Sequence, residues 1–283
     1  MRQILVISGK GGTGKTVITG SLAALAKNKV MVDCDVDAAD LYLILHPEII
    51  EQHKFRSGKT AVIDQIKCRH CGKCINACRF EAIKPNLTIE SFSCEGCGLC
   101  RYLCPCSAIS MKENIAGEWF VSDTKYGPFV HAKLGIAEDN SGKLVAKIRQ
   151  VAKEIADKQN LDYVIIDGPP GIGCPVIASL SGIDVALIIT EPTLSGLHDA
   201  KRVIELAKHF KIPVKLVVNK YDLNLEMTKK IELFCKENFI PIIGKIPFDK
   251  AIVESIVKGI PIVEYLNGNI KKEIIKIWHN LNL

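Results

Sequence analysis

The stretch ILVISGKGGTGKT, residues 4–16, decides the fold of this 283-residue chain. An apolar strand, Ile4–Ile7, runs into a glycine-rich loop, and an apolar helical pattern follows the loop. Gly9–Thr16 fits G-x-x-x-x-G-K-[ST] in the strand–loop–helix order that a phosphate-binding loop requires. Glycines let backbone N–H groups converge on phosphate oxygens, and a helix N-terminus attracts negative charge. The stretch predicts a nucleotide-binding P-loop; the alternative is a glycine-rich structural turn.

The P-loop pattern predicts a role for each of its residues. Lys15 is expected on the β- and γ-phosphates, and Thr16 is expected to bind Mg²⁺. The expected nucleotide-binding residues of the loop are Gly11, Gly12, Thr13, Gly14, Lys15 and Thr16. A nucleotide and Mg²⁺ are therefore predicted cofactors.

Eight of the twelve cysteines form two copies of one pattern. KCRHCGKCINACRFEAI begins at Lys67 and SCEGCGLCRYLCPCSAI begins at Ser93; both follow C-x2-C-x2-C-x3-C at an offset of 26 residues. This is the spacing of bacterial ferredoxins with two 4Fe–4S clusters, in which the fourth cysteine of each copy binds the other cluster. The prediction is one cluster on Cys68, Cys71, Cys74 and Cys104, and a second on Cys78, Cys94, Cys97 and Cys100.

Zinc and disulfides are the alternatives for these cysteines. Zinc takes four ligands, commonly as paired C-x2-C knuckles, so two triple runs fit it poorly. Disulfides are typical of small secreted chains, whereas this chain is large and Lys10 interrupts the only early apolar run that could resemble a signal peptide. A reducing, cytoplasmic setting with iron–sulfur ligation is the better explanation. Cys34, Cys106 and Cys235 are expected to be packing residues, with Cys106 close to the cluster run.

Net charge and hydropathy limit the classes of partner to be expected for this chain. The formal net charge is +6, and two thiolate-bound clusters would each contribute about −2, which leaves the loaded chain near neutral and gives no reason to expect nucleic acid. The sequence contains no run of about 18 apolar residues, so it predicts no membrane-spanning helix. The terminal stretch NIKKEIIKIWHNLNL predicts an amphipathic helix, which could be a membrane-surface anchor or could pack on its own domain; membrane contact is not the expectation.

Lys10 extends the motif beyond an ordinary P-loop. The loop resembles the deviant Walker A motif of the MinD/Mrp/nitrogenase-iron-protein group of P-loop ATPases. In that family the early lysine reaches across a dimer to the nucleotide of the partner. The resemblance implies that Lys10 is catalytic together with Lys15, and that the ATP state is a homodimer or a related heterodimer. A solvated surface lysine is the alternative.

Three further segments carry the same resemblance. VMVDCDVDAADL resembles switch I of the family and implies that Asp35 orients the attacking water. YVIIDGPPGIG resembles the Walker B and switch II segment of the Mrp branch and implies that Asp167 holds Mg²⁺ through water. Asn219 lies in an N-K-x-D pattern. In GTPases this pattern recognises the guanine base, whereas in this branch of the family the same place usually binds adenine through the Asn. Because Lys10 is typical of the ATP-using branch, ATP is preferred to GTP.

Cys174 lies seven residues past Asp167. The nitrogenase iron protein carries a cluster ligand at the same spacing, where paired cysteines from two subunits hold one cluster. The resemblance makes Cys174 a candidate intersubunit cluster ligand. A small buried cysteine at a helix start is the alternative.

Alternating strands and helices predict an α/β fold with a doubly wound, mostly parallel sheet of the P-loop type and an inserted ferredoxin-like α+β domain. The predicted boundaries are 1–62 and 113–283 for the discontinuous P-loop ATPase domain, and 63–112 for the inserted domain with two 4Fe–4S clusters. Thr60–Lys67, Glu118–Ser122 and Phe129–Ala137 are expected strands, and a helix is expected from about Ser141.

Two function classes follow from these parts. The first is an ATP-hydrolysing iron–sulfur protein, a nucleotide-gated dimer that couples ATP turnover to electron transfer or to assembly or delivery of a metallocofactor, with a redox or metallocofactor partner protein. The alternative is a positioning ATPase like MinD or the partition proteins, acting on a membrane or nucleoid surface with structural or sensory clusters. A ferredoxin with a degenerate nucleotide domain is a third hypothesis, which the complete set of motif residues disfavours.

Overall fold

The computed structural model of the chain describes residues 1–135 and 141–281. These residues divide into two compact units. The sheet unit comprises Met1–His53, Trp119–Lys133 and the chain from Ser141, and the cysteine unit comprises Lys54–Glu118 with Leu134 and Gly135. All eight cysteines of the two repeated runs lie in the cysteine unit, and the P-loop lies in the sheet unit.

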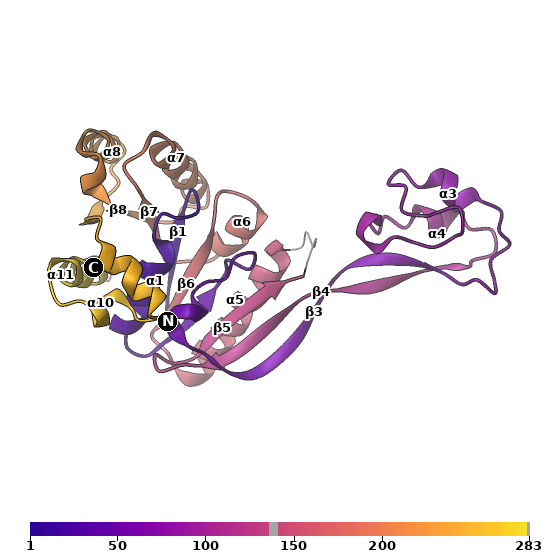
Figure 1. Ribbon diagram of the computed structural model, residues 1–283, viewed down its shortest axis with the longest axis horizontal. Helices are drawn as coiled ribbons and strands as arrows, with labels where there is room; N and C mark the ends of the chain where they lie inside the picture. Colours follow the sequence, from indigo (N-terminus) through magenta and orange to yellow (C-terminus); the bar gives the residue numbers. More distant parts are fainter. Residues whose placement is uncertain (136–140, 282–283) are drawn as a thin grey trace. The chain divides into compact units, whose positions relative to one another are not determined.

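Nine strands of the described chain form one sheet in the order β3-β4-β5-β2-β6-β1-β7-β8-β9 (Figure 1). β1 pairs in parallel with β6 and β7, β2 pairs in parallel with β5 and β6, and β8 pairs in parallel with β7 and β9. The predicted mostly parallel α/β sheet is therefore confirmed. The strands are β1 (Arg2–Ser8), β2 (Lys29–Asp33), β3 (Glu48–Ile63), β4 (Ile109–Asp123), β5 (Phe129–Leu134), β6 (Tyr163–Pro170), β7 (Val185–Thr190), β8 (Val214–Asn219) and β9 (Ile242–Ile246).

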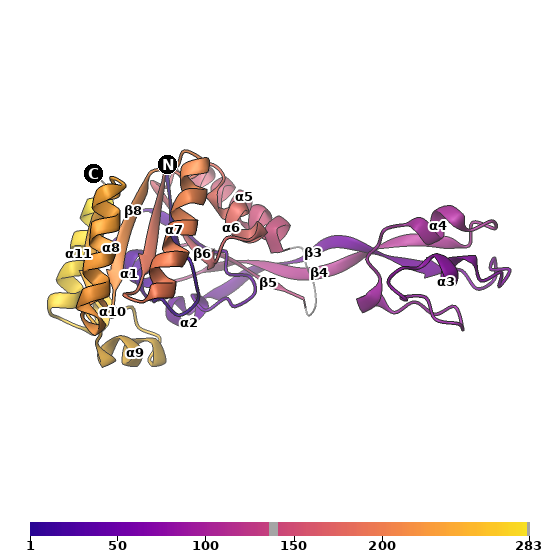
Figure 2. The same cartoon turned by 90° about the horizontal axis from the view of Figure 1, so that it is seen from above.

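Helices cover the central strands on both faces (Figure 2). Successive residues of a strand point to opposite faces, and Ile4, Leu5, Val6 and Ile7 are all fully buried, so both faces of β1 are covered. α1 packs with α10 and α11, whereas α5 packs with α6 against β2 and β6. The helices of this unit are α1 (Lys15–Leu25), α2 (Tyr42–Leu45), α5 (Ser141–Gln159), α6 (Cys174–Leu180), α7 (Leu194–His209), α8 (Leu225–Glu237), α9 (Lys250–Val257), α10 (Ile262–Tyr265) and α11 (Asn269–Leu281).

β3 and β4 are longer than the strands expected at Thr60–Lys67 and Glu118–Ser122, and they lie side by side in both views (Figure 1 and Figure 2). The first half of β3 is mostly polar and exposed, so its sequence has no alternating apolar pattern. Hydrogen bonding to the neighbouring strand holds it extended. β3 ends at Ile63 because Asp64 Oδ1 accepts the backbone N–H groups two and three residues further on, at 3.0 and 3.3 Å, which forms a turn.

The remaining expected elements agree with the structure over the described residues. The strand expected at Phe129–Ala137 is β5, and residues 136–137 lie outside the described chain. α5 begins at Ser141, as expected from the sequence.

The cysteine unit repeats one small motif. α3 (Lys73–Ala77) and α4 (Leu99–Leu103) each begin after a glycine with a left-handed backbone, Gly72 at φ 73° and Gly98 at φ 77°. A short 3-10 helix, η1 (Ser91–Ser93), precedes the second cysteine run. Six of the eight repeated cysteines pack against a small apolar core of Ala61, Ile63, Ile83, Leu87 and Ile109.

The apolar side of the terminal helix α11 faces the protein core. Ile270, Ile274, Ile277 and Leu281 are buried in the same apolar cluster as residues of β1, β7 and α1. Of the two roles open for this helix, packing on its own domain is the one observed. Over residues 1–135 and 141–281, the helices are too short or too polar to span a bilayer.

Lys29, the first residue of β2, provides a test of the packing at this strand. Its side chain is buried beside the ring of Tyr126, and burial lowers the pKa of Lys29 to about 8. Below that pH the folded state carries a buried ammonium, so we expect Lys29→Met to raise the free energy of unfolding at pH 7 by about 1–3 kcal/mol. The gain should shrink as the pH rises from 8 towards 10.5, because the folded wild type then loses this proton while the unfolded chain retains it. Thermal unfolding at a series of pH values measures this, with the exposed Lys27→Met as control; an equal gain at all pH values would contradict it.

Candidate nucleotide site and cysteine cavities

The phosphate loop joins β1 to α1 at the carboxyl end of the central strands. Gly12 and Gly14 have φ values of 76° and 88°, a left-handed conformation that glycine adopts without strain. α1 begins at Lys15 directly after this turn. A Cβ on Gly14 would come within 2.3 Å of the Asn219 amide nitrogen, so glycine is also required here by packing. The loop thus presents its backbone and a helix N-terminus to one cavity.

Lys15 lies among carboxylates. Its ammonium is 3.2 Å from Asp167 Oδ1 and 3.6 Å from Asp35 Oδ2, and its side chain is only 7% exposed. Burial disfavours the charged form, but Asp167, Asp33 and Asp35 outweigh it, so the pKa of Lys15 is raised. The lysine is therefore a fixed cation at the base of the loop, and the structure brings Lys15, Asp35 and Asp167 together. Their roles towards a nucleotide stay predictions.

Asp167 also binds two hydroxyls of α1. The Thr16 hydroxyl donates to Oδ2 at 2.9 Å, and the Thr19 hydroxyl donates to Oδ1 at 2.8 Å. Hydroxyl and carboxylate oxygens are ligands that suit Mg²⁺. Thr19 was not predicted; its position one helical turn after Lys15 is the signal that could have identified it.

Asp33 holds the segment that contains Asp35. Its carboxylate accepts the backbone N–H groups of Asp35 at 3.0 Å and Leu41 at 3.2 Å. Complete burial and the neighbouring Asp167 charge raise the pKa of Asp33. Burial also raises the pKa of Asp35, against the opposing effect of Lys15. Asp33 is therefore a positioning residue for Asp35.

An open cavity of about 570 Å³ lies beside the loop. The P-loop forms one wall, and Asp35, Asp37 and Ile44 from the segment after β2 form another. Pro169 and Pro170 at the end of β6 complete the opening. The segment after β2 and the end of β6 are the two segments that resemble switch I and switch II of the family.

Lys10 is held by residues of its own chain. Its ammonium is 2.6 Å from Glu191 Oε1 and donates to the Ser195 hydroxyl at 3.0 Å. Lys220 binds the other oxygen of Glu191 at 3.2 Å and donates to the Gly12 carbonyl at 3.1 Å. Lys10 is thus tied to the loop after β7 and to the first turn of α7. Its predicted contact across a dimer would require exchange of these partners.

Asn219 and Cys174 occupy the ends of two different elements. The Asn219 amide, at the end of β8, donates to the Thr13 carbonyl at 2.8 Å and so braces the P-loop. Its role towards adenine stays a prediction. Cys174 is exposed at the first residue of α6, rather than buried as in the packing alternative, and its role as a cluster ligand also stays a prediction.

The cysteine unit contains two cavities, and each is lined by all four cysteines of one predicted set. Cys68, Cys71, Cys74 and Cys104 line a small cavity of about 20 Å³, called here the first cavity. Cys78, Cys94, Cys97 and Cys100 line a small cavity of about 20 Å³, called here the second cavity. The fourth cysteine of each run therefore lies with the first three of the other run, which is the crossed arrangement inferred from the spacing.

Backbone amides point at the sulfur atoms of the first cavity. His70 N–H donates to Cys68 Sγ at 3.4 Å, and Ala108 N–H donates to Cys104 Sγ at 3.3 Å. Such bonds favour thiolates. Across residues 1–135 and 141–281, no three His, Cys, Asp or Glu side chains meet in a geometry suited to a single metal ion.

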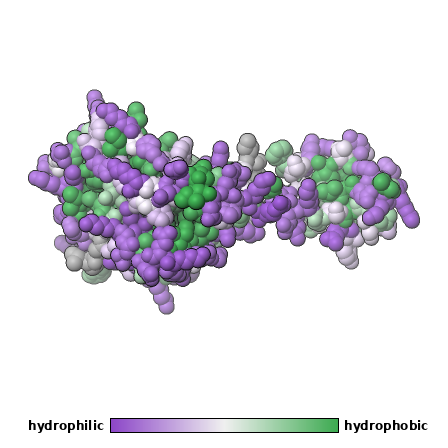
Figure 3. Space-filling model, turned by 90° about the horizontal axis from the view of Figure 1, so that it is seen from below, coloured by the Kyte–Doolittle hydropathy of each residue, from purple (hydrophilic) through white to green (hydrophobic). Residues whose placement is uncertain are grey.

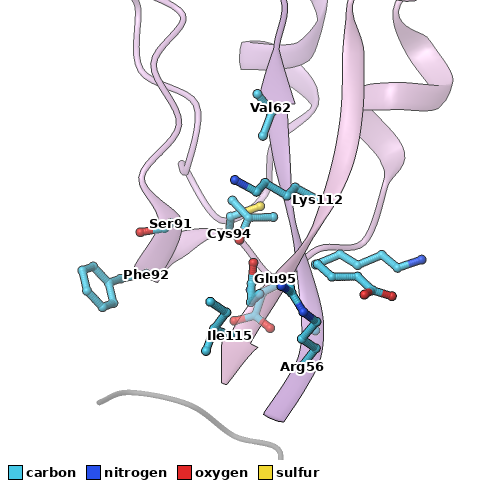
Figure 4. A pocket seen from close by; sticks show the side chains of 13 residues that line it. Arg56, Val62, Ser91, Phe92, Cys94, Glu95, Lys112 and Ile115 are labelled. Atoms are coloured by element: carbon cyan, nitrogen blue, oxygen red, sulfur yellow. The ribbon is translucent and has the colours of Figure 1, made fainter. Parts of the chain in front are cut away.

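A larger groove of the cysteine unit shares two residues with the second cavity. Cys94 and Glu95 line both, and in Figure 4 they face Lys112 and Ile115 while Phe92 projects outward. The groove also contains Arg56, whose side chain makes no ion pair with any described residue. Anything that occupies this groove would lie against the loop that carries Cys94.

Comparison with known proteins identifies the family of the chain. Residues 4–262 match the model of the CobQ/CobB/MinD/ParA nucleotide-binding domain. The chain belongs to this family. It is a P-loop ATPase of the MinD/ParA type, as Gly9–Thr16 and the acidic segments indicated.

The relatives cover most of the chain. An uncharacterized protein of Methanocaldococcus jannaschii is 39% identical over 230 residues, which are 78% of this chain and 79% of the relative. The septum site-determining protein MinD of Synechocystis is 28% identical over 272 residues, 93% of this chain and 82% of that protein. The MinD structure of Pyrococcus horikoshii, a complex with Mg-ADP, has a TM-score of 0.61 at 19% identity and covers 99% of this chain and 96% of that one, which shows a common fold.

Two lysine variants test the assignment of the loop. Lys15→Ala should lower ATP affinity at least about 10-fold, because the β- and γ-phosphates lose a charged hydrogen-bond donor. Lys10→Ala should leave ATP affinity within about 3-fold, because this lysine is tied to Glu191 rather than to the base of the loop. It should abolish hydrolysis, because the family resemblance implies that Lys10 stabilises charge on the nucleotide of a partner subunit. Titration calorimetry and phosphate release measure the two quantities. Wild-type hydrolysis by Lys10→Ala would remove Lys10 from the catalytic set.

Proposed function

We propose that this chain is a MgATP-gated ATPase that carries two 4Fe–4S clusters in its cysteine unit, and that it couples ATP turnover to electron transfer or to assembly or delivery of an iron–sulfur or other metallocofactor. The observation that carries the proposal is the pair of cavities, each lined by the four cysteines of one ferredoxin-type set. The insert, 63–112, would be the ferredoxin domain, and 1–62 with 113–283 the ATPase domain.

The chemistry of the cavities fits these clusters. Each offers four sulfur ligands, three of which pack against the apolar core. Glycines with positive φ let the loops turn closely around them. When bound, such clusters supply one-electron transfer at low potential. The chain's own contribution is to hold the sulfurs, exclude water through Ile63, Ile83 and Ile109, and donate backbone N–H groups to sulfur.

The nucleotide site would work by exchange of partners. ATP phosphates would replace the carboxylates around Lys15, and Mg²⁺ would take the oxygens of Thr16 and Asp167 that now bind each other. Asp35, positioned by Asp33, would orient the attacking water. Lys10 would leave Glu191 and stabilise charge on the nucleotide of a partner subunit, in a homodimer or related heterodimer.

Chain connectivity supports coupling of nucleotide state to the insert. Ile44 lines the nucleotide cavity, and β3 begins only four residues later at Glu48. On the return path, Phe129 and Val130 of β5 pair with Met31 and Val32, directly before the Asp33–Asp35 segment. Both connections of the insert therefore end at the segment that would respond to the γ-phosphate.

Exposed apolar side chains on the cysteine unit support a partner protein. Ile66, Phe92 and Tyr102 are 98%, 82% and 86% exposed, and Figure 3 shows apolar side chains gathered on the visible face of this unit. Exposed apolar surface of this kind marks interaction sites. A redox or metallocofactor partner would dock here, and Cys174 stays a candidate ligand at a subunit interface.

A positioning ATPase is the second candidate function. The similarity to MinD of Synechocystis over 93% of the chain favours it, because positioning at the septum is what that relative is named for. The buried apolar side of α11 would not be available to a membrane, so such a cycle would need another surface.

Metal content separates these functions first. Protein purified without oxygen should contain about eight iron and eight sulfide per chain and show two interacting 4Fe–4S signals on reduction. Iron and sulfide assays with electron paramagnetic resonance measure this. Stoichiometric zinc without sulfide would overturn the iron–sulfur proposal and favour positioning or scaffolding.

Nucleotide coupling is the second test. MgATP should change the reduction potential or the iron-chelation rate of at least one cluster relative to MgADP, and Asp35→Asn should hold the ATP-like value because hydrolysis stops after binding. Redox titration and chelator kinetics measure these quantities, with Lys15→Ala as the control that should not respond. Identical values in the apo, MgADP and MgATP forms would show that the clusters are not coupled to the nucleotide state.

A further inference from the structure

A fifth cysteine lies at the first cavity. Cys106 lines this cavity with the four cysteines of its predicted set. Its Sγ lies 3.7 Å from the Sγ of Cys104. The sequence predicted Cys106 as a packing residue, yet it is only partly buried and faces the same space as its neighbour.

The internal repeat defines what stands at the matching place of the second cavity. Ser107 and Glu81 have nearly the same left-handed backbone, with φ of 51° and 52°. Their N–H groups donate to the carbonyls of Cys104 and Cys78 respectively, both at 3.2 Å. The two turns therefore have one geometry, and Phe80 is the counterpart of Cys106.

Phe80 lines the second cavity just as Cys106 lines the first. At this position of the turn, one copy presents a second thiol to its cavity and the other presents an aromatic ring. Iron in a cluster of this kind is held by cysteine sulfur, which a phenyl ring cannot replace.

We propose that Cys106 is an alternative thiolate ligand for the corner of the first 4Fe–4S cluster that Cys104 binds. The inference rests on the proposed presence of the clusters. In the exchange, the iron–sulfur bond to Cys104 breaks, a bond to Cys106 forms, and the proton of the Cys106 thiol passes to Cys104. No electron is gained or lost. The first cluster would have two ligand states, whereas the second would have one.

The consequence is an asymmetry between the clusters. The N–H of Ala108 donates to Cys104 Sγ, and exchange would remove this hydrogen bond from the sulfur that binds iron. Hydrogen bonds to sulfur tune cluster potential, so the two ligand states would differ in potential. The first cluster would also survive loss of its fourth ligand.

The test uses the full-length chain purified without oxygen, with iron and sulfide assays and electron paramagnetic resonance. Cys104→Ala should retain about eight iron, because Cys106 replaces the lost thiolate, whereas Cys104→Ala with Cys106→Ala should lose at least one iron from the first cluster. Cys106→Ala alone should retain both clusters. Equal iron loss in Cys104→Ala and in the double variant would overturn the proposal.

The second copy supplies the matched control and an independent test. Cys78→Ala should lose iron from the second cluster, because Phe80 offers no thiol there. Cys78→Ala with Phe80→Cys should regain it, and this pair decides the question if Cys104→Ala does not fold. No regain in that case would overturn the proposal. Absence of iron and sulfide from the wild type would instead overturn the proposed function, so the two failures are distinguishable.

Discussion

The carboxylate of Asp167 is the interaction on which the sheet unit depends. Asp167 lies within β6 and is only 1% exposed, and its carboxylate contacts Lys15, Thr16 and Thr19 from the first two turns of α1. Its own backbone carbonyl accepts the N–H of Cys34 at the end of β2. A buried carboxylate is tolerated only when it is paired and hydrogen-bonded, and here those partners come from the loop that would bind phosphate. The same contacts therefore stabilise the carboxyl end of the central strands and preorganise the nucleotide site.

The burial of the central strands also explains where the sheet can tolerate an insertion. Strands β2, β6 and β1 form the centre of the sheet and are buried on both faces, so an insertion there would break the parallel ladder. β3 and β4 stand at the far edge of the strand order, beyond β5. The insert leaves and returns through this edge, yet its connections reach the Asp33–Asp35 segment through α2 and through the pairing of β5 with β2. An edge insertion can thus be both harmless to the core and connected to the nucleotide site.

Sequence reasoning worked where chemistry fixes spacing. The P-loop requires glycines at φ values that other residues avoid, and Gly12 and Gly14 have them. The mostly parallel sheet followed from continuous apolar strands, which burial on both faces demands. The extent of β3 was missed, because an exposed strand held by backbone pairing carries no apolar period. The intrachain partners of Lys10 and the bond from Asn219 to Thr13 were also missed, because they join loops that only the tertiary fold brings together.

The cysteine unit has an excess of basic residues over acidic ones. Residues 54–118 contain ten lysines and arginines against six aspartates and glutamates, a formal charge of +4 out of +6 for the whole chain. Neutral thiols leave this charge uncompensated, whereas two thiolate-bound 4Fe–4S clusters would contribute about −4 in total. Arg69 and Lys73 line the first cavity. With a cluster bound there, these cations would act as a counter-charge and lower the free-energy cost of placing an anionic group against an apolar core. The proposed clusters would thus account for the excess of basic residues in this unit without a nucleic-acid partner.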